Sequence, residues 1–499
     1  MSPPPLVSMR GISKSFGPVQ ACAEVDLTVQ AGDILGLLGE NGAGKTTLMN
    51  ILFGSYAADQ GTIEVEGKPA AIRSSADALG LGIGMVHQHF HLVPRHTVVE
   101  NLLVGRSGPD GRLTRRTVVE RLAAIGRDFH IRLDPNRLVG ELSIGEQQRV
   151  EIAKSLVRGA RILVLDEPTA TLTPQESEGL FAALRAMSAR GMGVIFISHK
   201  LAEVIEITNR ITVMRQGRVV AERVNAEGLS KGELARLMCG REMSPPERPP
   251  QAAGLPLLKL SNVSAPGLKD VSLTLRAGEI VGIAGVSGNG QRALADVIAG
   301  VLAPSRGAIE VHGVVVADLN PRDMQARGIG RVPEDRLAIG MIGALPLSES
   351  MALPWVGVPP FSRRGILDRK AIRKFATDQI DRFDIRTSGP DARTGTLSGG
   401  NLQKALLARE IAHEPKILLA AQPTRGVDVG ATEFIHGQFL ALRARGGAVL
   451  LISEDLEELF QLSDRIAVMY GGRIVADLPV EEATVERVGL LMAGVELAA

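Results

Sequence analysis

The sequence predicts two tandem α/β domains, each built on a mainly parallel sheet core that helices flank. Three observations lead to this fold class. The chain has 499 residues, which is more than one ordinary core supports. Each half alternates short apolar runs with helical patterns. Segments of the first half also return in the second half, so we expect two related domains of about 250 residues each.

The repeated segments keep their order along the chain. AGDILGLLGENGAGKTTL (Ala31–Leu48) returns as AGEIVGIAGVSGNGQRAL (Ala277–Leu294), 246 residues later. GELSIGEQQRVEIAKSLV (Gly140–Val157) returns as GTLSGGNLQKALLAREIA (Gly395–Ala412), 255 residues later. The difference of nine residues must lie between these two segments of the second half. We place it in the stretch LPLSESMALPWVGVPPFSRRG, residues 345–365.

A Pro-rich segment without periodicity separates the halves. SPPERPPQAAGLP occupies residues 244–256, and its composition is typical of a linker. We therefore predict a first domain over residues 1–243 and a second domain over residues 257–499. Within the first domain, residues 91–140 have a helical pattern with arginines among apolar positions, which indicates an inserted helical subdomain.

Composition excludes several classes of protein. Basic and acidic residues number 56 and 55, and the net charge of +1 gives no electrostatic argument for nucleic-acid binding. The 2 cysteines cannot form a disulfide framework, which favours a reducing cytosol. No apolar run reaches the roughly 18 residues of a membrane span, and the N-terminus does not resemble a secretory signal. A role at a membrane would therefore require another chain to do the spanning.

A phosphate-binding loop is predicted in the first half. GENGAGKT matches G-x-x-x-x-G-K-[ST] and follows the apolar strand ILGLL. Its glycines let backbone N–H groups turn toward phosphates, and the following helix N-terminus adds partial positive charge. Lys45 is expected to bridge the β- and γ-phosphates of ATP, and the Thr46 hydroxyl to ligate Mg²⁺. A glycine-rich turn without a ligand is the alternative, which the strand–loop–helix setting disfavours. The nucleotide-binding residues that we predict here are Gly39, Asn41, Gly42, Gly44, Lys45, Thr46 and Thr47.

Two carboxylates end a second apolar strand, in RILVLDEP (Arg161–Pro168). Asp166 at the strand end can hold Mg²⁺, directly or through water, and Glu167 can polarise the attacking water as a general base. Paired acids after a strand are in isolation more often a solvated turn. Downstream of a phosphate loop, they predict hydrolysis of ATP.

LSIGEQQ (Leu142–Gln148) and LSGGNLQ (Leu397–Gln403) resemble the signature motif found only in ABC ATPases, and the resemblance covers nearly the whole chain. It implies two tandem P-loop ABC ATPase domains, each with a mainly parallel sheet core and a helical subdomain. It also implies that Gln88 is the Q-loop glutamine, with a part in catalysis and in the metal site. By the same resemblance, His199 is the catalytic switch histidine and Phe16 stacks on adenine.

The resemblance further implies how the halves cooperate. In this family two domains dimerise head to tail, and the signature of one domain contacts the γ-phosphate held by the other. A signature supplies a Ser hydroxyl, Gly N–H groups and a helix N-terminus. Ser398, Gly399 and Gly400 of the second half are therefore expected to bind the nucleotide of the first-half loop.

The second half departs from the ABC pattern where the chemistry lies. It is not expected to hydrolyse ATP, because loss of a general base alone typically costs about 10²–10⁴ in rate. The first-half signature, which would face this degraded loop, has Ile144 in place of a glycine. Defects thus converge on one site, which indicates that the two domains pair within one chain. Whether the degraded loop still binds a nucleotide stays open, since Arg292 could pair with a phosphate while Glu334 and Glu454 would repel one. The replacements are Gln291 for Lys45, Arg292 for Thr46, Glu334 for Gln88, Ala421 for Asp166, Gln422 for Glu167 and Glu454 for His199.

Tandem domains without membrane spans resemble the ATP-hydrolysing subunits of importers for simple sugars and nucleosides. GMVHQHFHLVP, LSIGEQQRVEI and AAQPTRGVDVGA are most similar to the branch that serves nucleoside-type uptake. The resemblance implies a location at the cytoplasmic face of the cell membrane, with ATP and Mg²⁺ as cofactors. The implied partners are one or two kinds of membrane permease, docking near Phe90–Asn101, and indirectly a solute-binding protein.

The alternative is a soluble tandem ABC ATPase that acts on ribosomes or DNA. Such proteins usually have a long charged helical linker or zinc-binding inserts. The short Pro-rich linker, the 2 cysteines and the net charge of +1 disfavour this alternative. An exporter is disfavoured as well, because exporters often fuse membrane spans to the ATPase.

Overall fold

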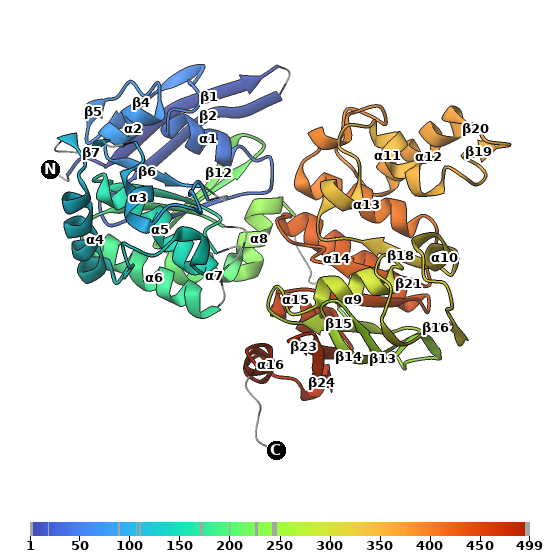
Figure 1. Ribbon diagram of the computed structural model, residues 1–499. Helices are drawn as coiled ribbons and strands as arrows, with labels where there is room; N and C mark the ends of the chain where they lie inside the picture. The colour runs from blue at the N-terminus through green and yellow to red at the C-terminus, as the bar shows by residue number, and fades with distance from the viewer. Residues whose placement is uncertain are drawn as a thin grey trace. The chain divides into compact units, whose positions relative to one another are not determined.

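The computed structural model describes residues 3–17, 19–87, 90–105, 107–108, 111–169, 172, 174–198, 200–224, 228–241 and 247–494. Two predicted site residues, Gln88 and His199, lie outside these ranges. The chain separates into two compact units, Met1–Ser244 and Pro245–Ala499. Each unit contains one six-stranded and one four-stranded sheet (Figure 1).

The first unit is centred on a six-stranded sheet of order β12-β11-β3-β10-β9-β6. All neighbouring strands pair in parallel except β12, which runs antiparallel to β11. The inner strands are continuous runs of buried apolar residues, as expected where helices cover both faces of a sheet. The strands are β3 (Ile34–Leu38), β6 (Ile83–Val86), β9 (Ile162–Asp166), β10 (Gly193–Ile197), β11 (Arg210–Arg215) and β12 (Arg218–Val224).

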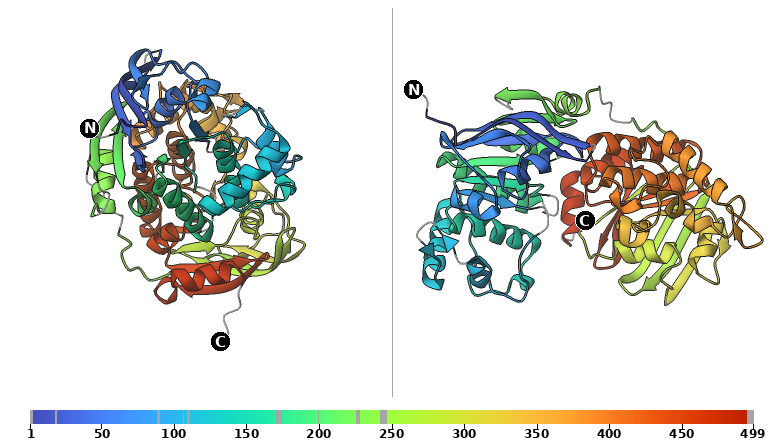
Figure 2. Two further views of the ribbon diagram at one scale, coloured as in Figure 1. Left: turned by 90° about the vertical axis from the view of Figure 1, so that its left-hand side faces the viewer. Right: turned by 90° about the horizontal axis from the view of Figure 1, so that it is seen from above.

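The first unit also contains a four-stranded antiparallel sheet of order β2-β1-β4-β5. The predicted helical subdomain is present: α3, α4 and α5 contact one another and extend to one side of the sheets (Figures 1 and 2). The elements are β1 (Val7–Phe16), β2 (Val19–Val29), α1 (Lys45–Leu52), β4 (Gln60–Val65), β5 (Lys68–Pro69), α2 (Ser75–Gly80), α3 (Val98–Leu103), β7 (Ser107–Gly108), β8 (Gly111–Arg112), α4 (Arg115–Phe129), η1 (Val139–Glu141), α5 (Ile144–Val157), α6 (Pro174–Ala189), α7 (Leu201–Ile207) and α8 (Lys231–Cys239).

The second unit repeats this topology, with sheets of order β24-β23-β15-β22-β21-β18 and β14-β13-β16-β17. Its parallel strands are again buried apolar runs. The strands are β13 (Pro256–Ala265), β14 (Leu268–Arg276), β15 (Ile280–Ala284), β16 (Arg306–Val311), β17 (Val314–Val315), β18 (Ile329–Val332), β19 (Ser362–Arg363), β20 (Ile366–Leu367), β21 (Ile417–Ala421), β22 (Ala448–Ile452), β23 (Arg465–Tyr470) and β24 (Arg473–Pro479). The helices are α9 (Gln291–Ile298), α10 (Pro321–Ala326), η2 (Arg336–Gly340), α11 (Leu347–Ala352), η3 (Leu353–Trp355), α12 (Arg369–Arg382), η4 (Thr394–Thr396), α13 (Gly399–Ile411), α14 (Val429–Ala444), α15 (Leu456–Leu462), η5 (Val480–Glu482) and α16 (Val485–Met492).

The nine additional residues of the second unit lie in two places. Val98 begins α3 and Leu347 begins the matching helix α11, and these residues are 249 apart rather than 246. Three of the nine therefore precede α11, where the chain forms the π-helical turn η2. The other six lie between α11 and the hairpin β19–β20, because this hairpin matches β7–β8 of the first unit at the full offset of 255 residues. The sequence had placed all nine within residues 345–365, so three lie further upstream than predicted.

The parallel strands bring distant loops together. In the first unit β10 lies between β3 and β9, and Ile197 at the end of β10 is paired with Asp166 at the end of β9. The carboxyl ends of parallel strands meet at one edge of the sheet, where α/β proteins commonly bind ligands. Among the described residues, no helix is both long and apolar enough to cross a membrane.

Candidate nucleotide-binding site

The loop between β3 and α1 requires glycine at three positions. Gly39, Gly42 and Gly44 have φ angles of 148°, 86° and 102°, a region that residues with a Cβ rarely adopt. A Cβ on Gly39 would overlap the carbonyl oxygen of Met214, and one on Gly44 would overlap that of Ala21. A Cβ on Gly42 would meet no atom within 4 Å, so only its backbone conformation requires glycine. These features suit a loop whose backbone wraps a phosphate group.

Lys45 begins α1 and returns its ammonium group to the loop. Its Nζ donates to the carbonyl oxygens of Gly39 at 2.6 Å and Glu40 at 3.0 Å. Gly44 is the N-cap of α1 and offers no side chain to the first N–H groups of the helix, which suits an anion at this end. The other predicted residues here are Asn41 and Thr46, which are exposed, and Thr47, which is half-buried.

Asp166 is electrostatically coupled to this loop. Burial, followed by the charge of Glu167, raises the pKa of Asp166 to about 6, and Lys45 opposes the shift. Only β10 separates β3, which precedes the loop of Lys45, from β9, which ends at Asp166, so both lie at the same edge of the sheet. A half-buried carboxylate beside a second acid favours a cation, and a divalent metal ion would supply that charge. The donor set fits Mg²⁺, which prefers oxygen ligands.

Glu167 occupies an unusual backbone conformation that both units share. Its φ is 48°, and its N–H donates to the carbonyl oxygen of Ile197 at 2.9 Å. In the second unit Gln422 also has a φ of 48°, and its N–H donates to Ile452 at 2.8 Å. Non-glycine residues in this region cost energy and cluster at functional sites. The second unit thus keeps the backbone of the site and changes its side chain.

Phe16 offers an aromatic face at the end of β1. The side chain is 44% exposed, and its ring meets Tyr56 edge to face with centroids 5.4 Å apart. Lys14 Nζ lies 5.7 Å from the centroid of the Phe16 ring and pairs with Asp59 at 2.7 Å. An exposed ring that a second ring supports can stack on a purine base. The sequence alone does not mark Tyr56, which meets Phe16 only when the segment between α1 and β4 folds against the end of β1, whereas Lys14 lies two residues before Phe16 on the same strand.

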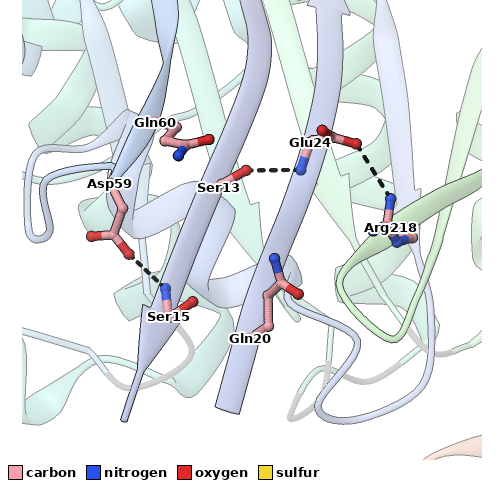
Figure 3. Close-up of a pocket in the computed structure, with 7 residues that line it drawn as sticks. All are labelled: Ser13, Ser15, Gln20, Glu24, Asp59, Gln60 and Arg218. Atoms are coloured by element: carbon pink, nitrogen blue, oxygen red, sulfur yellow. Dashed lines mark hydrogen bonds and ion pairs between the residues drawn. The ribbon is translucent and has the colours of Figure 1, made fainter. Parts of the chain in front are cut away.

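A shallow polar groove lies on the same antiparallel sheet (Figure 3). Ser15 N–H donates to Asp59 at 2.8 Å, and Glu24 N–H donates to Ser13 Oγ at 3.0 Å. Because Ser13, Ser15 and Asp59 are already engaged in these hydrogen bonds, we assign no ligand to this groove. Its lining residues are Ser13, Ser15, Gln20, Glu24, Asp59, Gln60 and Arg218.

Carboxylates surround the signature of the first unit. Ser143 caps α5 by accepting the N–H of Glu146, whose carboxylate accepts the N–H of Ser143 at 2.9 Å. The Ser143 hydroxyl donates to Glu176 Oε1 at 3.3 Å. A Cβ on Gly145 would overlap the same carboxylate. Two negative groups therefore stand where an approaching phosphate would need donors.

The signature of the second unit is arranged differently. Ser398 is the N-cap of α13 but makes no side-chain cap, and its Oγ accepts from the Asn401 amide at 2.9 Å. Among the described residues, no carboxylate accepts a hydrogen bond from the Ser398 hydroxyl. At Gly399 a Cβ would lie 3.1 Å from the guanidinium of Arg336. At Gly400 it would lie 3.4 Å from Ala431 and 3.5 Å from the carboxylate of Asp428, which is further away than the carboxylate that a Cβ on Gly145 would overlap. This signature can donate to a γ-phosphate, whereas the hydroxyl of Ser143 already donates to a carboxylate.

The second unit carries other chemistry at the positions of the phosphate site. Gln291 Nε2 donates to the carbonyl oxygen of Val286 in the loop at 3.0 Å. Arg425 pairs with Glu334 at 2.5 Å. Burial raises the pKa of Glu454, and the charge of Arg425 opposes that shift. At the positions of the phosphate lysine and the acid pair this unit therefore has Gln291, Ala421 and Gln422, and an ion pair occupies the position that corresponds to Gln88.

A family model described as ABC transporter matches residues 22–170 and 268–425, more than half of the chain. The chain belongs to the ABC transporter family. This ABC protein is 43% identical to the glucose import ATP-binding protein TsgD13 of Haloferax volcanii, over 99% of this chain and 96% of the relative. It is 40% identical to the nucleoside import ATP-binding protein NupA of Lactococcus lactis, over 98% of each chain. The guanosine import ATP-binding protein NupO of Bacillus subtilis is 41% identical, over 98% of this chain and 97% of the relative.

These relatives confirm that the protein is the ATP-binding, ATP-hydrolysing subunit of an ABC importer, with two ABC ATPase domains as predicted. Among solved structures, the archaeal ribosome recycling factor aABCE1 has a TM-score of 0.61 over 97% of this chain and 92% of its own. At 20% identity this likeness shows the fold alone. The ribosome-directed alternative therefore gains no support from it.

Proposed function

We propose that this ABC subunit powers the uptake of a nucleoside or a simple sugar by hydrolysing Mg²⁺-ATP at its first unit. The observation that carries the proposal is that the parallel strands β3 and β9, with only β10 between them, bring the loop of Lys45 and the acid pair Asp166–Glu167 to one edge of the sheet. At the matching positions the second unit has Gln291 and Ala421. The substrate class follows from full-length relatives named for the import of glucose, nucleosides, guanosine and ribose.

Each predicted site residue of the first unit has a role in this proposal. Lys45 and the loop N–H groups bind the β- and γ-phosphates, and Phe16 stacks on adenine. Asp166 and Thr46 hold Mg²⁺, which when bound would neutralise charge on the phosphate oxygens. Glu167 polarises the attacking water and accepts its proton. Gln88 as a metal and catalytic residue and His199 as a catalytic residue are proposed from the ABC pattern, since they lie outside the described residues.

We also propose a division of labour along the chain. Residues 1–243 form the competent nucleotide-binding domain, residues 244–256 the linker, and residues 257–499 the degenerate domain. Ser398, Gly399 and Gly400 complete the first-half site by intrachain pairing, as the ABC pattern implies. Support comes from each unit taken by itself: the signature with available donors belongs to the unit without a phosphate lysine.

The proposed partners are membrane permeases of one or two kinds, which hold the protein at the cytoplasmic face of the membrane. We place their docking near residues 90–101. Val93 is 40% exposed in this segment, and the buried Asn101 fixes it by donating to the carbonyl oxygens of Val93 and Thr97, each at 3.1 Å. A solute-binding protein would act only through the permeases. Purification from native membranes should recover multi-span permeases, whereas recovery of ribosomal or DNA-repair proteins would overturn the transport function.

Replacement of the proposed base tests the chemistry directly. Glu167→Gln is expected to lower steady-state phosphate release by about 10²–10⁴-fold, because an amide keeps the shape but cannot accept a proton. Binding of a fluorescent ATP analogue should persist. Glu178→Gln, at an exposed position of α6, is the matched control and should hydrolyse ATP normally. Turnover retained by Glu167→Gln would show that another group is the base.

A further inference from the structure

The turn that begins at Arg336 is a feature of the second unit. In the first unit the corresponding described residues, 90–97, contain no helix, whereas Arg336–Gly340 form a π-helical turn. Asp335 caps this turn by accepting the N–H groups of Leu337 at 3.0 Å and Ala338 at 2.7 Å. The residues added before α11 therefore build a defined structure.

The guanidinium of Arg336 joins two other segments of the unit. Nη1 donates to the carbonyl oxygen of Gly399 at 3.4 Å, and Nη2 donates to the carbonyl oxygen of Arg425. Gly399 lies in the signature, next to Ser398, and Arg425 lies in the loop that follows β21. A Cβ on Gly399 would lie 3.4 Å from the carbonyl oxygen of Gly426, so the signature is also in close contact with that loop.

The far end of the turn is attached to the same helix. Arg409 of α13 donates to the carbonyl oxygen of Gly340 at 2.6 Å. Arg409 is only 7% exposed, and it pairs with Glu410 at 2.8 Å. The position of Arg336 relative to the first turn of α13 is thus fixed at two points.

Arg336 is held at an energetic cost. Burial lowers its pKa to about 10, the charge of Arg425 acts in the same direction, and Asp335 opposes the shift. The side chain still carries its charge at neutral pH. A guanidinium presents N–H groups in a rigid planar fork that can reach two acceptors at once, which a lysine ammonium on a flexible stem does not match. The two carbonyl oxygens give a reason for its burial here.

We propose that Arg336 is a positioning residue for ATP hydrolysis, which holds the signature segment Ser398–Gly400 in place against the loop that carries Arg425. This inference rests on the proposed function, in which this signature completes the first-half site. The signature hydroxyl and N–H groups stabilise a γ-phosphate only when their geometry is held to about 0.5 Å. Arg336 acts through them.

Substitution of Arg336 in the full-length chain tests this role. Arg336→Gln is expected to lower kcat by about 10- to 100-fold, the loss that a displacement of about 1 Å produces, while the KM for ATP changes little. Arg336→Lys keeps the charge and one of the contacts and should recover part of kcat. Arg369→Gln, an exposed charge removal on α12, is the matched control. Unfolding followed by Trp355, the single tryptophan of the chain, verifies that each variant folds.

A double-mutant cycle with Ser398→Ala separates the possible outcomes. If Arg336 acts through the signature, Arg336→Gln should add little to the loss that Ser398→Ala causes alone. Additive losses would overturn the inference and leave the proposed function intact, as would a normal kcat for Arg336→Gln beside an impaired Ser398→Ala. A normal kcat for Ser398→Ala would instead remove the proposed pairing on which the inference rests.

Discussion

Burial and the charge of Glu167 raise the pKa of the Asp166 carboxyl, which makes the stability of the first unit depend on pH. In the unfolded chain its pKa is the ordinary value of 3.8, and in the folded protein it is about 6. Folding therefore favours the protonated form. The stability that this preference contributes is present below about pH 4 and is lost as the pH rises to about 6. Without a bound cation, ionised Asp166 then costs on the order of 3 kcal/mol.

Asp166→Asn is accordingly expected to raise the Tm of the nucleotide-free protein at pH 7.5 and to change it little at pH 4. In the presence of Mg²⁺-ATP the effect should reverse, because the variant lacks a metal ligand while the native protein gains stability from binding. Thermal unfolding across this pH range measures both effects. Asp134→Asn, at an exposed position of the same unit, is the control. A Tm gain for Asp166→Asn that does not depend on pH would contradict the assigned pKa.

Single residues differ in how far the sequence can predict them. Lys45 and Asp166 lie within continuous motifs, so their local pattern already indicates their chemistry. Tyr56 and Arg336 carry no such pattern, since Tyr56 meets Phe16 and Arg336 meets Gly399 only after distant segments fold together. The sequence also shows Ile144 as the defect of the first signature, and Ser143 and Glu146 have the spacing of a capping box. It does not show the contact of Ser143 with Glu176, because that contact depends on packing.

The secondary-structure elements also differ in whether a local sequence pattern predicts them. Short β-branched runs such as ILVLD and GVIFI predict the buried parallel strands, because their pattern and burial are local. Subtraction of motif positions predicts that nine residues are added to the second half. It cannot tell how they divide, because the π-helical turn before α11 is defined by hydrogen bonds rather than by composition.

The described part of the Pro-rich linker is attached to the second unit. Arg248 pairs with Asp464 at 2.6 Å, and Arg443 donates to the carbonyl oxygen of Pro249 at 2.9 Å. Further along, the N–H of Gly254 donates to the carbonyl oxygen of Ala277 at 2.8 Å. A composition rich in Pro predicts the absence of regular periodicity, but it says nothing about such contacts.

Asp464 is the centre of this attachment, and its removal should destabilise the second unit. It accepts two hydrogen bonds from Arg443, which is 1% exposed, and one from the N–H of Ile280. Asp464→Ala leaves the buried guanidinium unpaired, which is expected to cost about 3 kcal/mol. Denaturant unfolding followed by Trp355 fluorescence should shift to a lower midpoint, while nucleotide binding by the first unit persists. Asp381→Ala, at an exposed position, serves as control, and an unchanged midpoint for Asp464→Ala would show that the attachment is weak.

At the scale of the whole molecule, the two units keep one topology and differ in chemistry. Matching strand orders and the shared φ of 48° at Glu167 and Gln422 show that the scaffold is the same. The first unit has the phosphate lysine and the acid pair, and the second has the signature with available donors. Selection for a fold acts on the core, whereas selection for hydrolysis acts on a few side chains at the strand ends. One intact site is therefore compatible with two intact cores.

This asymmetry predicts unequal effects at equivalent positions. Lys45→Ala should lower the ATPase rate of the full chain by about 10²-fold or more, because a preorganised positive group at the developing phosphate charge is lost. Gln291→Ala removes one hydrogen bond to Val286, worth about 1 kcal/mol of stability, and should change the rate by less than about threefold. Equal losses from both substitutions would contradict the asymmetry. A lysine placed in the loop of the second unit should not restore hydrolysis. Gln291→Lys in a Lys45→Ala background should remain inactive, because Ala421 and Gln422 still supply neither a metal ligand nor a base.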